Sequence, residues 1–129
     1  MDVIDVIISK FRCNASNYRI CITVIYLISQ NYGVVFLLKK LLEEYGYGND
    51  VYGYNFPNIF DPSDSDDEYY FESGIQFYFH NDMQVVSNSE VVKLLKEFCG
   101  LYIESEYENV EEVSALLKEI TTRFCNAPE

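Results

Sequence analysis

The spacing of the apolar residues changes twice along this chain, and no other feature constrains the fold as much. Four stretches repeat apolar residues every three or four positions, as one face of an amphipathic helix does. These stretches are residues 3–12, 34–45, 91–102 and 110–124. Between the second and the third, residues 69–79 alternate, which is typical of a strand. We therefore predict one α+β domain over residues 1–129, with N-terminal helices, a small central antiparallel sheet or hairpin, and two C-terminal helices.

Short motifs mark where some of these helices begin and end. Ser87 and Glu90 have the spacing of a capping box, in which each side chain binds a free backbone N–H of the first helical turn. Gly46 and Gly48 are expected to end the helix over residues 34–45, because glycine readily adopts the left-handed conformation found after helices.

Residues 18–30 fit two secondary structures. Ile20, Ile22 and Val24 are β-branched and would suit a strand, whereas the position between two helical stretches favours a buried helix. We expect the helix. The apolar run that ends at Ile28 has nine residues, far fewer than the roughly 20 that a membrane-spanning helix needs, so it is expected to lie in the core.

Turn-forming residues divide the middle of the chain into short segments. Residues 51–56 are expected to form a short edge strand, and residues 63–68 a solvated acidic loop. The dipeptide Asn81-Asp82 predicts a tight hairpin turn, after which residues 83–87 pair with the alternating stretch.

The charge of the chain is concentrated in one region. Residues 41–92 contain no lysine or arginine but eleven acidic residues and seven tyrosines, and they hold nearly all of the net charge of −12. Direct binding to nucleic acid or to an anionic membrane is therefore disfavoured, because both depend mainly on Lys and Arg. Acidic side chains attract a basic partner, and tyrosine adds contact area and a hydroxyl. The composition predicts a basic protein partner, with no direct nucleic acid, no membrane and no small-molecule ligand.

The most concentrated part of this region is the candidate partner-binding surface. Its acids would pair with Lys and Arg of the partner, and its two tyrosines would supply packed contacts. The candidate residues are Asp61, Asp64, Asp66, Asp67, Glu68, Tyr69, Tyr70 and Glu72.

The titratable residues form no recognisable catalytic or metal-binding pattern. His80, the single histidine, adjoins the predicted turn, and an exposed turn histidine is a simpler interpretation than a general base paired with Asp82. A calcium loop over residues 61–72 would place Asp66 where glycine is required and Ser63 at the third position. We therefore expect no catalytic residues, no metal site, no cofactor and no enzyme activity.

The cysteines indicate the compartment. No two of them form a C-x-x-C motif, and a chain this rich in apolar residues does not need disulfides for stability. The first residues lack the basic segment of a secretory signal. We expect reduced thiols and a cytoplasmic protein. The cysteines are Cys13, Cys21, Cys99 and Cys125.

Three segments together carry a resemblance to a known family. Residues 45–50 read YGYGND, residues 53–58 read GYNFPN and, after the acidic loop, residues 71–77 read FESGIQF. Over roughly residues 45–102 the chain resembles immunity proteins of bacterial contact-dependent growth inhibition systems, particularly those paired with ribonuclease toxins. The resemblance implies a cytoplasmic protein without enzymatic activity. Such a protein binds the C-terminal domain of its cognate toxin, a basic nuclease, and occludes its active or substrate-binding site.

Two other functions are compatible with the same residues. An acidic protein can imitate nucleic acid and regulate a basic DNA- or RNA-binding protein, in which case it would bind many basic partners and release them in moderate salt. An enzyme built from tyrosine and acidic residues would show activity without any partner. An immunity protein should instead select one partner and retain it.

Overall fold

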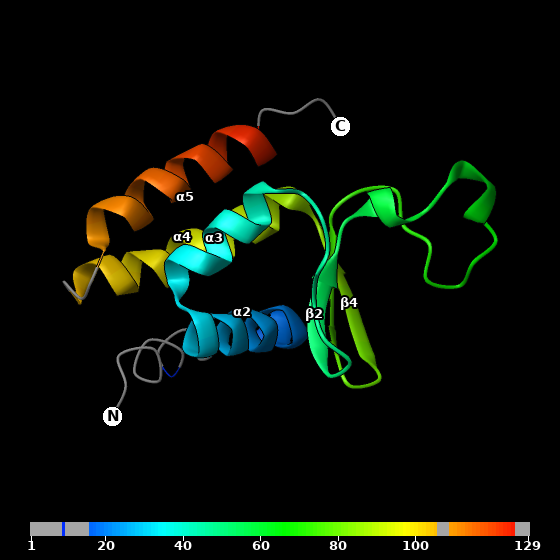
Figure 1. The fold of residues 1–129 in the computed structure, drawn as a ribbon, viewed down its shortest axis with the longest axis horizontal. Helices are drawn as coiled ribbons and strands as arrows, with labels where there is room; N and C mark the ends of the chain where they lie inside the picture. The colour runs from blue at the N-terminus through cyan, green and yellow to red at the C-terminus, as the bar shows by residue number, and fades with distance from the viewer. Residues whose placement is uncertain (1–8, 10–15, 106–108, 126–129) are drawn as a thin grey trace.

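The fold is seen in a computed structural model that describes residues 9, 16–105 and 109–125. Most of the helix predicted over residues 3–12 lies outside the described residues. The remaining elements follow the predicted order of helices, antiparallel strands and two C-terminal helices, which confirms the α+β fold (Figure 1).

The ambiguous segment is helical. A 3-10 turn, η1 (Ser16–Tyr18), leads into α2 (Arg19–Tyr32), so the predicted buried helix is confirmed. Its β-branched residues are tolerated because packing outweighs their weak helix propensity: Val24, Ile25 and Ile28 are at most 1% exposed. Gly33, with φ of 100°, then turns the chain through 117° into α3 (Val34–Leu42).

No single described helix is long and apolar enough to cross a membrane. Only α2 and α3 taken together reach the required length and composition, and they are sharply bent at Gly33. The apolar faces of both helices pack in the core of this fold, where Ile25 and Leu38 are almost completely buried.

The end of α3 differs from the sequence prediction. The helix ends at Leu42, and the left-handed residue is Glu44, with φ of 57°, while Gly46 follows in ordinary conformation. The backbone N–H of Glu44 donates to the carbonyl of Leu41 at 3.1 Å. A non-glycine residue adopts this conformation because contacts to the C-terminal helix and to the following loop hold it there.

The sheet has four antiparallel strands in the order β1-β2-β3-β4. The strand predicted over residues 51–56 is present but is not at the edge of the sheet, because a two-residue strand pairs with it on one side and β3 on the other. The hairpin turn is His80-Asn81, one residue earlier than predicted, with His80 at φ of 54°. The strands are β1 (Tyr47–Gly48), β2 (Tyr52–Asn55), β3 (Ile75–Phe79) and β4 (Asp82–Val86).

The helices cover only one face of the sheet. Figure 1 shows α2 to α5 on one side of the strands, and the segment between β2 and β3 on the other. Tyr54, Ile75 and Phe77 point from the strands into the helical side and are almost fully buried. The last two helices, α4 (Asn88–Glu104) and α5 (Val110–Cys125), complete the core. The cap predicted at Ser87 is present, since its hydroxyl accepts from the N–H of Glu90 at 3.3 Å.

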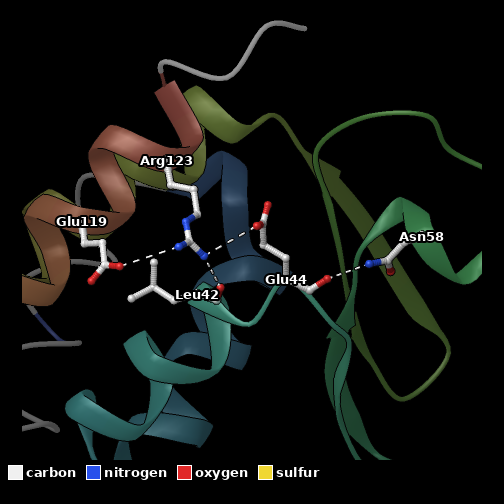
Figure 2. A network of polar contacts seen from close by, with 5 residues as sticks. All are labelled: Leu42, Glu44, Asn58, Glu119 and Arg123. Atoms are coloured by element: carbon white, nitrogen blue, oxygen red, sulfur yellow. Dashed lines mark hydrogen bonds and ion pairs between the residues drawn. The ribbon is translucent and has the colours of Figure 1, made fainter.

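A polar network joins the end of α3 to α5 and to the loop after β2 (Figure 2). Arg123 donates from Nη1 to the carbonyl of Leu42 at 2.7 Å, and its guanidinium lies 3.7 Å from the carboxylates of both Glu44 and Glu119. From the other side, Asn58 donates from Nδ2 to the carbonyl of Glu44 at 2.7 Å. Glu44 is therefore held by contacts from α5 and from the loop.

We predict that Arg123→Ala lowers the free energy of unfolding by about 1 kcal/mol, because it removes a charge-assisted hydrogen bond to a helix carbonyl on the surface. Urea unfolding followed by circular dichroism measures the change. Lys118→Ala on the same helix is the control, since this exposed side chain makes no ion pair with the described residues. Equal effects of the two substitutions would contradict a stabilising role for Arg123.

Candidate functional site

The candidate surface lies on a long excursion between β2 and β3, which we call the acidic loop (residues 56–74). It contains two short 3-10 turns, η2 (Pro57–Ile59) and η3 (Pro62–Asp64). In Figure 1 it projects beyond the sheet on the side away from the helices. The solvated acidic segment predicted over residues 63–68 is confirmed, because every residue in it is exposed.

Successive turns shape the tip of the acidic loop. The N–H groups of Asp64, Asp67 and Tyr70 donate to the carbonyls of the residues three positions earlier, at 2.9, 2.8 and 3.1 Å. Two carboxylates reinforce these turns: Asp64 Oδ2 accepts from the N–H of Asp61 at 2.9 Å, and Asp67 Oδ1 accepts from the N–H of Tyr69 at 2.8 Å. Short acidic side chains commonly bond to the nearby backbone in this way. Asp64 and Asp67 therefore help to define the loop conformation.

The acids of the loop form no ion pair with the residues that the structure describes. The ion pairs of the described residues involve Glu43, Glu44, Glu90, Glu112 and Glu119, and none of the candidate acids. Asp66 and Glu72 are exposed and form no hydrogen bond or ion pair with the described part of the chain. Their charges are thus uncompensated and directed to solvent, so a basic surface could approach them without first displacing an internal partner.

The two candidate tyrosines differ in their surroundings. Tyr69 is 50% exposed, and a hydrogen bond to the Glu68 carboxylate raises the pKa of Tyr69 above its ordinary value. Tyr70 instead packs edge-on against Phe60, with ring centroids 5.4 Å apart, and Phe60 in turn contacts the buried ring of Phe71. Tyr69 is therefore available to a partner, whereas Tyr70 helps to fold the base of the loop.

A buried amide fastens the acidic loop to the sheet. Gln76 on β3 is 4% exposed; its Oε1 accepts from Asn55 Nδ2, and its Nε2 donates to the carbonyl of Tyr69, both at 3.3 Å. A buried amide without partners is costly, so these bonds favour one position of the loop over the strands. The loop is attached at its other end by the bond from Asn58 to the carbonyl of Glu44.

The close approach of β1 and β2 at two glycines explains part of the motif in residues 45–58. Gly48 and Gly53 are paired across β1 and β2, and the side chain of Tyr78 lies over both. An added Cβ at Gly53 would lie 2.5 Å from both the Tyr78 hydroxyl and the carbonyl of Tyr47. The Tyr78 hydroxyl donates to the carbonyl of Asn49 at 2.7 Å. The glycines thus bring the strands close together under an aromatic ring.

The outer face of β4 also carries apolar residues that sequence reasoning missed. Met83 and Val85 are 44% and 49% exposed, while the polar Gln84 between them points to the helical side. There Gln84 accepts from the N–H of Cys21 at 3.3 Å and donates to the carbonyl of Asn17 at 2.8 Å. The usual alternation is therefore inverted over residues 83–85, whereas Val86 at the end of β4 is apolar and buried. The alternation of Met83, Gln84 and Val85 indicated a strand with two different faces, but it did not show which face was buried.

The structure does not assemble a catalytic or metal site from the residues it describes. Within this part of the chain, no three His, Cys, Asp or Glu side chains form a group that could hold a metal ion. His80 is exposed on the hairpin turn, as predicted, with its ring against that of Phe79. Cys21 and Cys99 are buried free thiols, and burial raises the pKa of Cys99 to about 12, which makes it a poor nucleophile.

Fold and surface together define a small acidic α+β protein with exposed carboxylates on one loop and exposed apolar side chains on one strand. A family model described as CDI immunity protein, in which CDI denotes contact-dependent growth inhibition, matches residues 17–117. A search of curated proteins returns no match. The chain belongs to the CDI immunity protein family, and this gives it an immunity role against a toxin that it binds. The resemblance inferred from residues 45–102 is confirmed.

We predict that Gly53→Ala lowers the free energy of unfolding by at least about 2 kcal/mol, because the new methyl group would collide with backbone atoms as well as with Tyr78. Gly100→Ala is the matched control: nothing lies near its Cβ position, and alanine should stabilise α4 by about 1 kcal/mol. Chemical unfolding of both variants measures the difference. A Gly53→Ala variant as stable as the parent would show that the close approach of the strands at Gly53 does not require glycine.

We also predict that a water-soluble disulfide reagent modifies Cys125 much faster than Cys21 or Cys99 in the folded chain. Cys125 is exposed, whereas burial raises the pKa of both other thiols. Peptide mapping after a short labelling time at pH 8 gives the three rates, and labelling in urea provides the unfolded reference. Comparable native rates would contradict the burial of Cys21 and Cys99.

Proposed function

We propose that this chain neutralises a basic nuclease toxin, a ribonuclease, by placing the acidic loop over its active or substrate-binding site. The observation that supports the proposal is the set of uncompensated carboxylates held on a folded, projecting loop. Nucleases that act on RNA carry Lys and Arg where the phosphates bind, since phosphate affinity comes mainly from these residues. Carboxylates at the same positions would compete directly with the substrate.

The described residues have distinct parts in this proposal. Asp66, Glu68 and Glu72 pair with basic residues of the toxin, and the exposed ring and hydroxyl of Tyr69 supply a packed contact. Asp64 and Asp67 also contribute charge while holding the turns of the loop. The inhibitor itself performs no chemistry; it acts by occupation of the toxin surface. It would act in the cytoplasm, where the RNA substrates of the toxin are.

Opposite charges should also speed the encounter. Electrostatic attraction can raise association rates to roughly 10⁸–10⁹ M⁻¹s⁻¹ at low salt. For a protein that must intercept an incoming toxin, a high association rate is as useful as a slow dissociation. The exposed, projecting position of the acidic loop supports this role.

We predict that the triple variant Asp66→Asn, Glu68→Gln and Glu72→Gln binds the cognate toxin domain at least about tenfold more weakly, mainly through slower association. These substitutions keep the backbone bonds to Asp64 and Asp67 intact. Surface plasmon resonance at two salt concentrations measures the rates, and protection of RNA from the toxin measures inhibition.

The matched control is Glu97→Gln, Glu104→Gln and Glu111→Gln, which removes the same charge from exposed helix positions. It should bind within about threefold of the parent. If both triple variants bind equally, the acidic loop is not the contact surface. If the parent binds many unrelated basic proteins and loses them in moderate salt, a general nucleic-acid mimic is the better description.

A further inference from the structure

β4 forms the long free edge of the sheet among the strands that the structure describes. β1, at the opposite edge, has only two residues, and its Tyr47 is covered by the ring of Phe36 at 5.3 Å. β4 has five residues and pairs on one side only, with β3. A sheet edge of this length presents backbone groups that can pair with another strand.

The register shows which backbone groups point outward. The N–H of His80 donates to the carbonyl of Val51 at 2.6 Å, so His80 and, by alternation, Tyr78 and Gln76 direct their backbone groups to β2. The intervening residues of β3 then direct theirs to β4, where Phe77 faces Gln84. It follows that the N–H and C=O groups of Met83 and Val85 point away from the sheet.

In the part of the chain that the structure describes, this edge has few of the features that normally prevent strand addition, and its one charged residue, Asp82, lies at its end. β4 contains no lysine and no proline, and its pairing with β3 is continuous without a bulge. Its outward backbone groups belong to the same residues, Met83 and Val85, whose apolar side chains are half exposed on the outer face. The bonds of Gln84 to Cys21 and Asn17 hold the strand in one register, so the edge is rigid.

The edge also lies beside the acidic loop. Val85 is the direct partner of Gln76 in the sheet, and Gln76 holds the carbonyl of Tyr69 at 3.3 Å. An extended segment lying along β4 would therefore direct apolar side chains toward Met83 and Val85. It would also pass close to the exposed acids of the loop. At its other end it would meet the exposed Asp82.

We propose that the toxin adds an extended, basic segment to β4, so that main-chain hydrogen bonds from Met83 and Val85 anchor it next to the acidic loop. This rests on the proposed function, since it specifies how the same partner is held. The charge of the loop favours a basic partner, because a segment with lysine or arginine complements the acids. A second copy of this chain, with its own net charge of −12, would be repelled. Main-chain bonds supply affinity in such pairings, and alternate side chains supply specificity.

Amide hydrogen exchange of the wild-type chain tests this directly, with and without the cognate toxin domain. In the free chain the amides of Met83 and Val85 should exchange much faster than that of Gln84, which is bonded to β3. In the complex, the exchange of Met83 and Val85 should slow by at least about tenfold. Unchanged exchange at both residues in a saturated complex would overturn the inference.

Substitutions supply the second test. Val85→Pro removes the outward N–H without touching a bond of the hairpin, and should weaken toxin binding by at least about tenfold. Val85→Thr keeps the N–H and should stay within about threefold. Val85→Lys should weaken binding much more than Val51→Lys, which makes the same change at a similarly exposed valine away from β4. If Val85→Pro does not fold, the comparison of Val85→Lys with Val51→Lys and the hydrogen-exchange data test the inference.

The outcomes separate this inference from the proposed function. If the acidic triple variant loses binding while Val85→Pro and Val85→Lys bind like the parent, the loop is the contact and the edge strand is not. If the wild-type chain does not bind the toxin domain, both proposals fail. If Met83 and Val85 become protected at high concentration of the chain alone, a second copy occupies the edge and the inference is overturned.

Discussion

The burial of α2 against the inner face of the sheet is the contact on which the rest of the structure depends. Ile25 and Ile28 are almost completely buried in the same core as Tyr54 and Phe77. Because α3, α4 and α5 assemble on this side as well, helices α2 to α5 all lie on one face of the sheet. The opposite face is left to Tyr78, the acidic loop and the exposed side chains of β4. One-sided packing thus creates both the stability of the fold and its available surface.

The sequence predicted the elements that carry a long periodic pattern. The apolar stripe from Val91 to Tyr102 and the cap at Ser87 located α4 correctly. Elements without such a pattern were not predictable: two-residue β1 has no period, and its presence converted β2 from an edge strand to an interior one. Likewise, the expectation that Gly46 ends the helix placed the end of α3 too late. The helix ends at Leu42 because contacts from Arg123 and Asn58 hold Glu44 in the left-handed conformation. These tertiary contacts leave no local signal in the sequence.

The sequence indicated where the candidate surface lies, but not which of its residues face solvent and which make contacts within the loop. Charge clustering identified the acidic loop, but only the structure separates Asp66, which faces solvent, from Asp67, which bonds to its own turn. Tyr69 and Tyr70 are adjacent and chemically identical, yet one is exposed and the other packs on Phe60. Met83 and Val85 were overlooked because the half-buried Gln84 between them points inward, against the usual rule that apolar residues do so.

The acidic loop is attached to the rest of the fold by residues other than its exposed acids. Asn58, Phe60, Phe71 and Gln76 fasten the two ends of the loop, and all of them lie outside the acid-rich tip. A change at Asp66 or Glu68 therefore leaves the core and these fastenings untouched. Under the proposed function, substitutions at the tip would change the surface offered to the toxin, while the stability of the fold depends on a different set of positions.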